Sequence, residues 1–60
     1  MKFLQSHYND KKVSIVLSQI VAVIENDEGK TLVCATDGEG YTLTEPYDQI
    51  MNKIEKERYK

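Results

Sequence analysis

The sequence has few of the residues that usually cross-link a very small domain. Its 60 residues include one cysteine, one histidine, one proline and no tryptophan. Cys34 alone cannot form an internal disulfide, and Cys34 with His7 falls short of the roughly four ligands of a structural zinc site. A chain this short buries only about 60% of its unfolded surface, so it needs a further source of stability. We therefore expect self-association, and we expect neither a metal nor a cofactor.

Long apolar runs are also missing. No segment approaches the roughly 20 apolar residues of a membrane span, and no apolar run near Met1 has the length of a signal-peptide core. A single unpaired cysteine favours a reducing compartment. These features predict one domain over residues 1–60, a cytoplasmic location and no membrane partner.

Charge is unevenly distributed along the chain, whose formal net charge is −2. Residues 1–24 carry +2, residues 25–48 carry −6 and residues 49–60 carry +2. Proteins that bind nucleic acid usually show a basic stripe or patch. The acidic middle would repel a phosphate backbone, so the sequence predicts no nucleic-acid partner.

Alternating apolar residues between turn signals predict a series of strands. The expected strands are residues 2–8, 12–17, 20–25, 31–36 and 39–43. Asn9-Asp10 and Asp37-Gly38 are turn pairs, and Asp-Gly between alternating runs is a strong hairpin signal. A polar loop is expected over residues 26–29. Gly40 weakens the last strand and predicts a bulge or a close backbone approach there.

The third expected strand, residues 20–25, is apolar on both faces. Strict alternation places Ile20, Ala22 and Ile24 on one face and Val21 and Val23 on the other. Val16 extends the second face. One helix covers one face of a sheet, whereas two-sided apolarity implies that both faces are covered. Two explanations stay open: a strongly curved sheet with its inside filled, or a homo-oligomer with Val16, Val21 and Val23 at its interface.

A C-terminal amphipathic helix follows the last strand. Its apolar positions are Tyr47, Ile50, Met51 and Ile54, a helical spacing. Pro46 suits the first helical position, with Thr44 or Glu45 as the N-cap, and the helix should fray beyond Arg58. The predicted fold is therefore α+β: an antiparallel β-meander of four to five strands followed by one C-terminal amphipathic helix.

The order of these motifs resembles the FlbD-like family of small bacterial and phage proteins. The resemblance rests on the strand I-V-A-V-I, the hairpin T-L-V-C-A-T-D-G and the helix start Y-T-L-T-E-P-Y-D-Q-I, and it extends from Phe3 to Ile54. The chain departs from the family in having Pro46 where a serine is usual, and in lacking a basic residue before Glu45. The resemblance implies the same fold and brings no catalytic or cofactor residues.

No group of side chains predicts a reaction. His7 and Cys34 have no partner at a catalytic spacing, and Asp37, Glu39 and Glu45 match no cation-binding loop. Turn and capping roles account for Asp37 and Glu45. We therefore expect a protein that is not an enzyme.

Four tyrosines in a short chain indicate a binding surface, since tyrosine combines a large apolar ring with a polar tip. Tyr8 and Tyr41 lie in the expected strands. The candidate ligand- or partner-binding residues are His7, Tyr8, Asn9, Glu39 and Tyr41. Two functions remain open. The first is a non-enzymatic binding protein that self-associates and acts on a protein partner as an adaptor or regulator. The second is a phage-type sponge that sequesters a nucleotide-derived small-molecule signal at its subunit interfaces.

Overall fold

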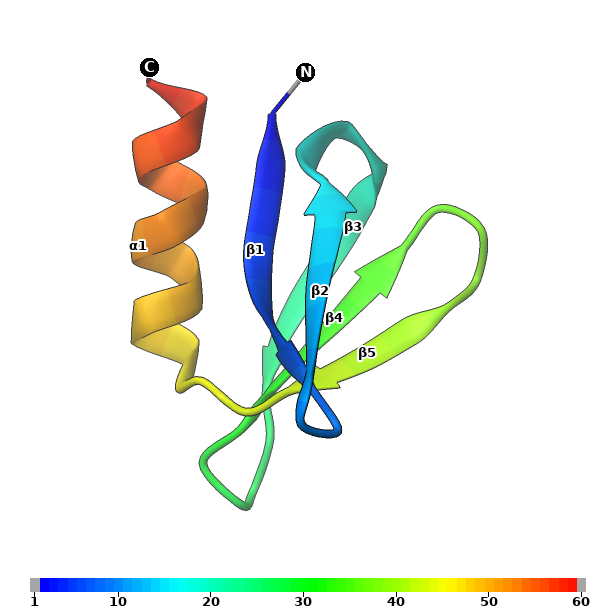
Figure 1. Ribbon diagram of the computed structural model, residues 1–60, viewed down its shortest axis with the longest axis vertical. Helices are drawn as coiled ribbons and strands as arrows, with labels where there is room; N and C mark the ends of the chain where they lie inside the picture. Colours follow the sequence, from blue (N-terminus) through cyan, green and yellow to red (C-terminus); the bar gives the residue numbers. More distant parts are fainter. Residues whose placement is uncertain (1, 60) are drawn as a thin grey trace.

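The computed structural model describes residues 2–59 and combines a β-meander with one C-terminal helix (Figure 1). The elements are β1 (Phe3–Tyr8), β2 (Lys11–Val16), the 3-10 turn η1 (Leu17–Gln19), β3 (Ile20–Glu25), β4 (Thr31–Ala35), β5 (Gly40–Leu43) and α1 (Tyr47–Arg58). Each strand pairs antiparallel with a sequence neighbour. The predicted α+β fold is confirmed, although the strands form two sheets, β1-β2 and β3-β4-β5.

The turns follow from residues that tolerate left-handed backbone conformations. Asn9 and Asp10 have φ angles of 50° and 63°, so they close β1-β2 as a two-residue turn. Gly29 in the β3–β4 loop and Gly38 in the β4–β5 loop have φ angles of 79° and 88°, so both are also left-handed. In the β4–β5 hairpin, the Gly38 amide donates to the Ala35 carbonyl and the Ala35 amide donates to the Glu39 carbonyl. The loop is therefore one residue longer than a two-residue Asp-Gly turn.

One apolar core lies between the two sheets and α1. Its buried side chains are Leu4, Ile15, Val33, Leu43, Ile50 and Ile54. Ile50 and Ile54 belong to the predicted apolar stripe of α1, which lies along β1 and also reaches β3 (Figure 1). Burying one such side chain contributes about 1.5–3 kcal/mol. The inside of the curved meander is thus filled by its own residues.

The third strand departs from the predicted alternation because it contains a bulge. The β3–β4 register shifts between Ile20 and Ala22, which leaves Val21 unpaired and 64% exposed. One extra residue reverses the phase of a strand. Ile20 and Val23 therefore both pack against the core, while Ile24 is 48% exposed. The prediction that Ile20, Ala22 and Ile24 share one face, opposite Val21 and Val23, was wrong.

The start of α1 also differs from the prediction. Pro46 is the N-cap residue, with an extended backbone at φ −63° and ψ 157°, and Tyr47 is the first helical residue. The Pro46 carbonyl accepts a hydrogen bond from the Ile50 amide at 3.1 Å. No side chain caps the helix. Glu45 does not cap because its carboxylate is bound by other side chains.

Removing a core side chain should destabilise the fold far more than removing one from the outer sheet face. Leu43 is fully buried, so Leu43→Ala should lower the free energy of unfolding by about 3 kcal/mol. Half-buried Leu32, on the neighbouring strand β4, is the matched control, and Leu32→Ala should cost about 1 kcal/mol. Urea unfolding followed by circular dichroism at low protein concentration measures both values. Equal losses would contradict the core described above.

Candidate functional site

An apolar groove of about 680 Å³ runs between α1 and the outer edge of β3. Its lining includes Val16 from β2, Leu17 from η1, Val21 and Val23 from β3, and Met51 and Ile54 from α1. The three residues predicted for an oligomer interface, Val16, Val21 and Val23, therefore lie along one groove. Val23 also packs against the core, whereas Val21 projects to solvent.

The outer face of the β3-β4-β5 sheet is apolar as well. Leu32 and Cys34 are half-buried and alternate along β4 with the buried Thr31, Val33 and Ala35. A Cβ placed on Gly40 would lie 3.4 Å from Leu32 Cδ1, a side-chain atom, and Gly40 stays in register opposite Cys34. The structure therefore shows neither the bulge nor the close backbone approach predicted at Gly40. Together with exposed Ile24, these residues form an apolar surface that α1 does not cover.

Of the five candidate binding residues, the structure brings two aromatic rings into contact. The Tyr8 and Tyr41 rings lie 5.8 Å apart, edge to face, at an interplanar angle of 88°. Both rings are half-buried and pack against the core. They link β1 to β5, as does the hydrogen bond that the Thr44 amide donates to the His7 carbonyl at 3.2 Å. The tyrosine pair therefore helps to hold the two sheets together.

The other three candidates lie apart from that pair or point outward. Asn9 is exposed in the β1–β2 turn, and the side chain of His7 is exposed opposite Lys12. Glu39 is exposed in the β4–β5 loop, which lies away from the β1–β2 turn (Figure 1). The Glu39 amide donates to the Asp37 carboxylate at 2.9 Å, a turn contact. The five residues do not form one site.

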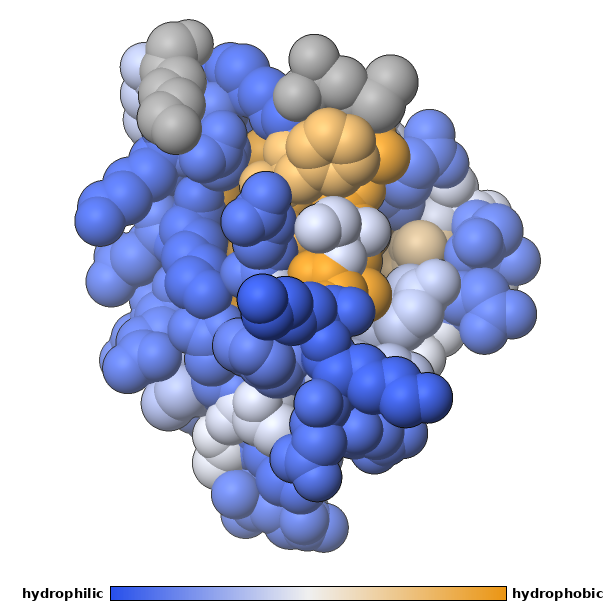
Figure 2. All heavy atoms as spheres, in the orientation of Figure 1, coloured by the Kyte–Doolittle hydropathy of each residue, from blue (hydrophilic) through white to orange (hydrophobic). Residues whose placement is uncertain are grey.

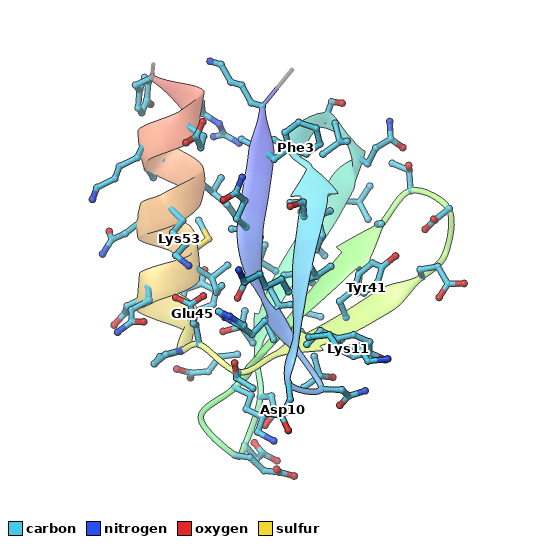
Figure 3. The ribbon with its side chains drawn as sticks, in the orientation of Figure 1. Phe3, Asp10, Lys11, Tyr41, Glu45 and Lys53 are labelled. Atoms are coloured by element: carbon cyan, nitrogen blue, oxygen red, sulfur yellow. The ribbon has the colours of Figure 1, made fainter. Side chains whose placement is uncertain are left out.

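A polar network centred on Glu45 joins α1 to both sheets (Figure 3). Glu45 Oε1 accepts hydrogen bonds from Ser6 Oγ and from Lys53 Nζ, each at 2.6 Å. Lys53 Nζ also donates to the Gln5 carbonyl at 3.0 Å, and Thr31 Oγ1 donates to the Glu45 carbonyl at 2.8 Å. The network gives partners to the buried hydroxyls of Ser6 and Thr31. A serine among inward-facing positions of β1 was the available sequence signal, because a buried hydroxyl needs a partner.

The environment of Glu45 favours its charged form. Partial burial alone would raise its pKa, but the hydrogen bonds from Lys53 and Ser6 and the charges of Lys53 and His7 outweigh burial. The pKa of Glu45 is therefore lowered from its usual value of 4.5. A lowered pKa means that the folded protein stabilises the carboxylate relative to the unfolded chain.

A second groove, of about 850 Å³, crosses the outer side of the β1–β2 hairpin and is bordered by α1. Its lining includes the basic residues Lys12, Lys53 and Lys56, together with His7 and Phe3. The face that carries β1 and β2 shows an apolar patch surrounded by hydrophilic side chains (Figure 2). This basic groove was not predicted, since its residues come from three separate parts of the chain.

Within residues 2–59, no three histidine, cysteine or acidic side chains lie close enough together to hold a metal ion. The same residues include no helix with the length and apolarity of a membrane span. Cys34 is a free thiol.

No protein-family model matches the chain, and comparison with curated proteins and with solved structures finds no match. The FlbD-like resemblance therefore stays a prediction from the sequence pattern.

Acid should weaken the fold through Glu45. Since its folded pKa is lowered, Glu45 contributes stability above about pH 4.5, and this contribution is lost as the pH falls through the folded pKa. Glu45→Gln should cost about 1 kcal/mol at neutral pH and should flatten the acid side of the stability curve. Thermal unfolding between about pH 3 and 7 measures this, with Glu25→Gln on the exposed end of β3 as the control. Parallel curves for Glu45→Gln and wild type would show that ionisation of Glu45 does not contribute to stability.

The Tyr8–Tyr41 contact should appear as a coupling energy. Edge-to-face aromatic pairs contribute about 0.5–1.5 kcal/mol beyond the apolar area that they bury. A double-mutant cycle with Tyr8→Leu and Tyr41→Leu should therefore give a coupling of about 1 kcal/mol in urea unfolding. Additive effects of the two substitutions would mean that the rings act independently.

Proposed function

We propose that this chain is a non-enzymatic binding protein that self-associates and acts on a protein partner as an adaptor or regulator. The observation that supports this proposal most strongly is the edge strand β3. It carries the exposed apolar side chains Val21 and Ile24, and an apolar groove runs beside it.

Edge strands expose backbone groups that can pair with a further strand. Protein edges of this kind are usually protected by charge, proline, a bulge or a covering element. β3 has the bulge at Val21, but its exposed residues before Glu25 are apolar, and the neighbouring outer face adds Leu32 and Cys34. An edge with this composition favours β-augmentation by another strand.

The occupant that fits this edge is a second copy of the chain, with the two β3 strands antiparallel. Lys2 and Arg58 line the groove near Ile20, at the start of β3. The opposite end of β3 leads into Glu25 and the acidic β3–β4 loop. A two-fold axis brings the same patch of both subunits together, so the acidic end of one β3 would face the basic end of the other. Attraction between these ends would favour this pairing.

Pairing in this way would also supply the additional buried surface that so short a chain needs for stability. Two three-stranded sheets would become one continuous sheet of six strands, doubling the three strands of each copy. The apolar groove beside β3 would then lose water, while the outer face of the sheet would stay exposed. Association of this kind adds apolar burial that a chain of 60 residues cannot supply alone.

The proposed role as an adaptor or regulator uses the surfaces that the dimer leaves exposed. A dimer would present its remaining apolar surface and the tyrosine-bearing side of β1 and β5 to a protein partner. The single free thiol, Cys34, suits a reducing cytoplasm.

Val21→Asp tests self-association. Val21 is 64% exposed and lies in a bulge, so the variant should fold, while a carboxylate buried between two copies should prevent pairing. Sedimentation velocity should show a dimer for wild type and a monomer for Val21→Asp, with matching circular dichroism spectra. The control is Ser14→Asp, which adds the same charge at an exposed position of the other sheet and should stay dimeric.

A wild-type protein that stays monomeric at millimolar concentration would refute the self-association. Dimers of Val21→Asp equal in affinity to wild type would place the interface elsewhere. Val23→Asp is a weaker test, because Val23 packs against the core and its loss of folding would be ambiguous.

A further inference from the structure

The geometry points to a binding site for a small phosphate-bearing ligand with a planar ring, of the nucleoside phosphate class, in the basic groove. This groove lies on the β1-β2 sheet, whereas the proposed dimer uses β3, so the two proposals stand or fall separately. Three observations support the site: its charge, the fixed position of one lysine and an exposed aromatic ring.

Positive charge gathers in this groove although the chain as a whole is acidic. Lys12 reaches it from β2, and Lys53 and Lys56 from α1. Neither Lys12 nor Lys56 forms an ion pair with a described residue. Two carboxylates oppose this charge, Glu57 in the lining and Glu45 in its ion pair with Lys53, so the three lysines leave an excess of positive charge. A cleft in which charge of one sign predominates attracts ligands of the opposite sign.

One ammonium group is already held in place. Lys53 Nζ donates to Glu45 Oε1 at 2.6 Å and to the Gln5 carbonyl at 3.0 Å. A lysine ammonium has three N–H donors, so these two bonds leave one for a ligand. Fixing a side chain before binding lowers the entropy lost on association. Lys53 therefore holds one N–H donor for an anionic ligand in a fixed position at the edge of the groove.

The ring and the size of the groove indicate the rest of the ligand. Phe3 is 38% exposed at the groove (Figure 3). Gln5 and Ser14, paired across β1 and β2, line the same groove and offer hydrogen-bonding groups. Any nucleobase can stack on an exposed aromatic ring, because every base has a π-face. A volume of about 850 Å³ lies within the range of small-molecule sites. A nucleoside phosphate would place its base on Phe3 and its phosphates among Lys12, Lys53 and Lys56.

Isothermal titration calorimetry of the full chain with ATP, AMP, adenosine and inorganic pyrophosphate tests the site. Affinity should fall from ATP to AMP to adenosine as phosphate charge is removed. Lys12→Gln and Lys56→Gln should each weaken ATP binding about tenfold, the effect of one charge-assisted bond. Lys30→Gln is the matched control: it removes the same charge from the β3–β4 loop, where Lys30 pairs with Glu28, and should bind ATP like wild type.

Phe3→Leu separates the ring contact from a structural role. It should weaken ATP binding several-fold and leave pyrophosphate binding unchanged, since pyrophosphate has no base. Ser14→Asp should abolish ATP binding in a dimeric protein, and Val21→Asp should keep ATP binding in a monomer. The inference is overturned if no probe binds, if Lys30→Gln weakens binding as much as Lys12→Gln, or if single-stranded RNA binds and ATP does not.

Discussion

Glu45 is the residue on which the arrangement of the helix depends. Its carboxylate accepts hydrogen bonds from Ser6 of β1 and Lys53 of α1, and its carbonyl accepts one from Thr31 of β4. One residue in a short linker thus contacts both sheets and the helix. Because Ser6 and Thr31 are buried, the network also removes the cost of two unpaired hydroxyls. The same placement of α1 is the one in which Ile50 and Ile54 pack against the core.

The bulge at Val21 divides the roles of the third strand. Before and after it, Ile20 and Val23 face the core, so the strand still contributes to the fold. The extra residue directs Val21 to solvent, beside the groove along α1. A strand that alternates strictly would place its apolar residues on two fixed faces. With the bulge, one short strand supplies both core packing and an exposed apolar edge.

Local signals account for most of what the sequence predicts correctly. The turn pairs, the alternation in β1, β2 and β4 and the spacing of Ile50 and Ile54 are all short-range patterns, and the structure confirms the elements that they predict. The errors at β3 and at Glu45 have long-range causes. A bulge depends on how β3 pairs with β4, and the role of Glu45 depends on Ser6, 39 residues away. A local sequence pattern predicts neither the β3–β4 pairing at the bulge nor the contact between Ser6 and Glu45. The basic groove was missed for the same reason, because its residues come from β1, β2 and α1.

Lys2 Nζ donates a hydrogen bond to the Arg58 carbonyl at 3.0 Å, so the two described ends of the chain lie side by side (Figure 1). Adjacent ends are the condition under which circular permutation is tolerated. The loop between β3 and β4 is exposed and closes through a glycine, which makes it a suitable new opening. A permuted chain that begins at β4 would keep the β4–β5 and β1–β2 hairpins, and the β3–β4 pair would join the two new ends of the chain. The order of β1 to α1 along the chain would then be one of several ways to build the same packed unit.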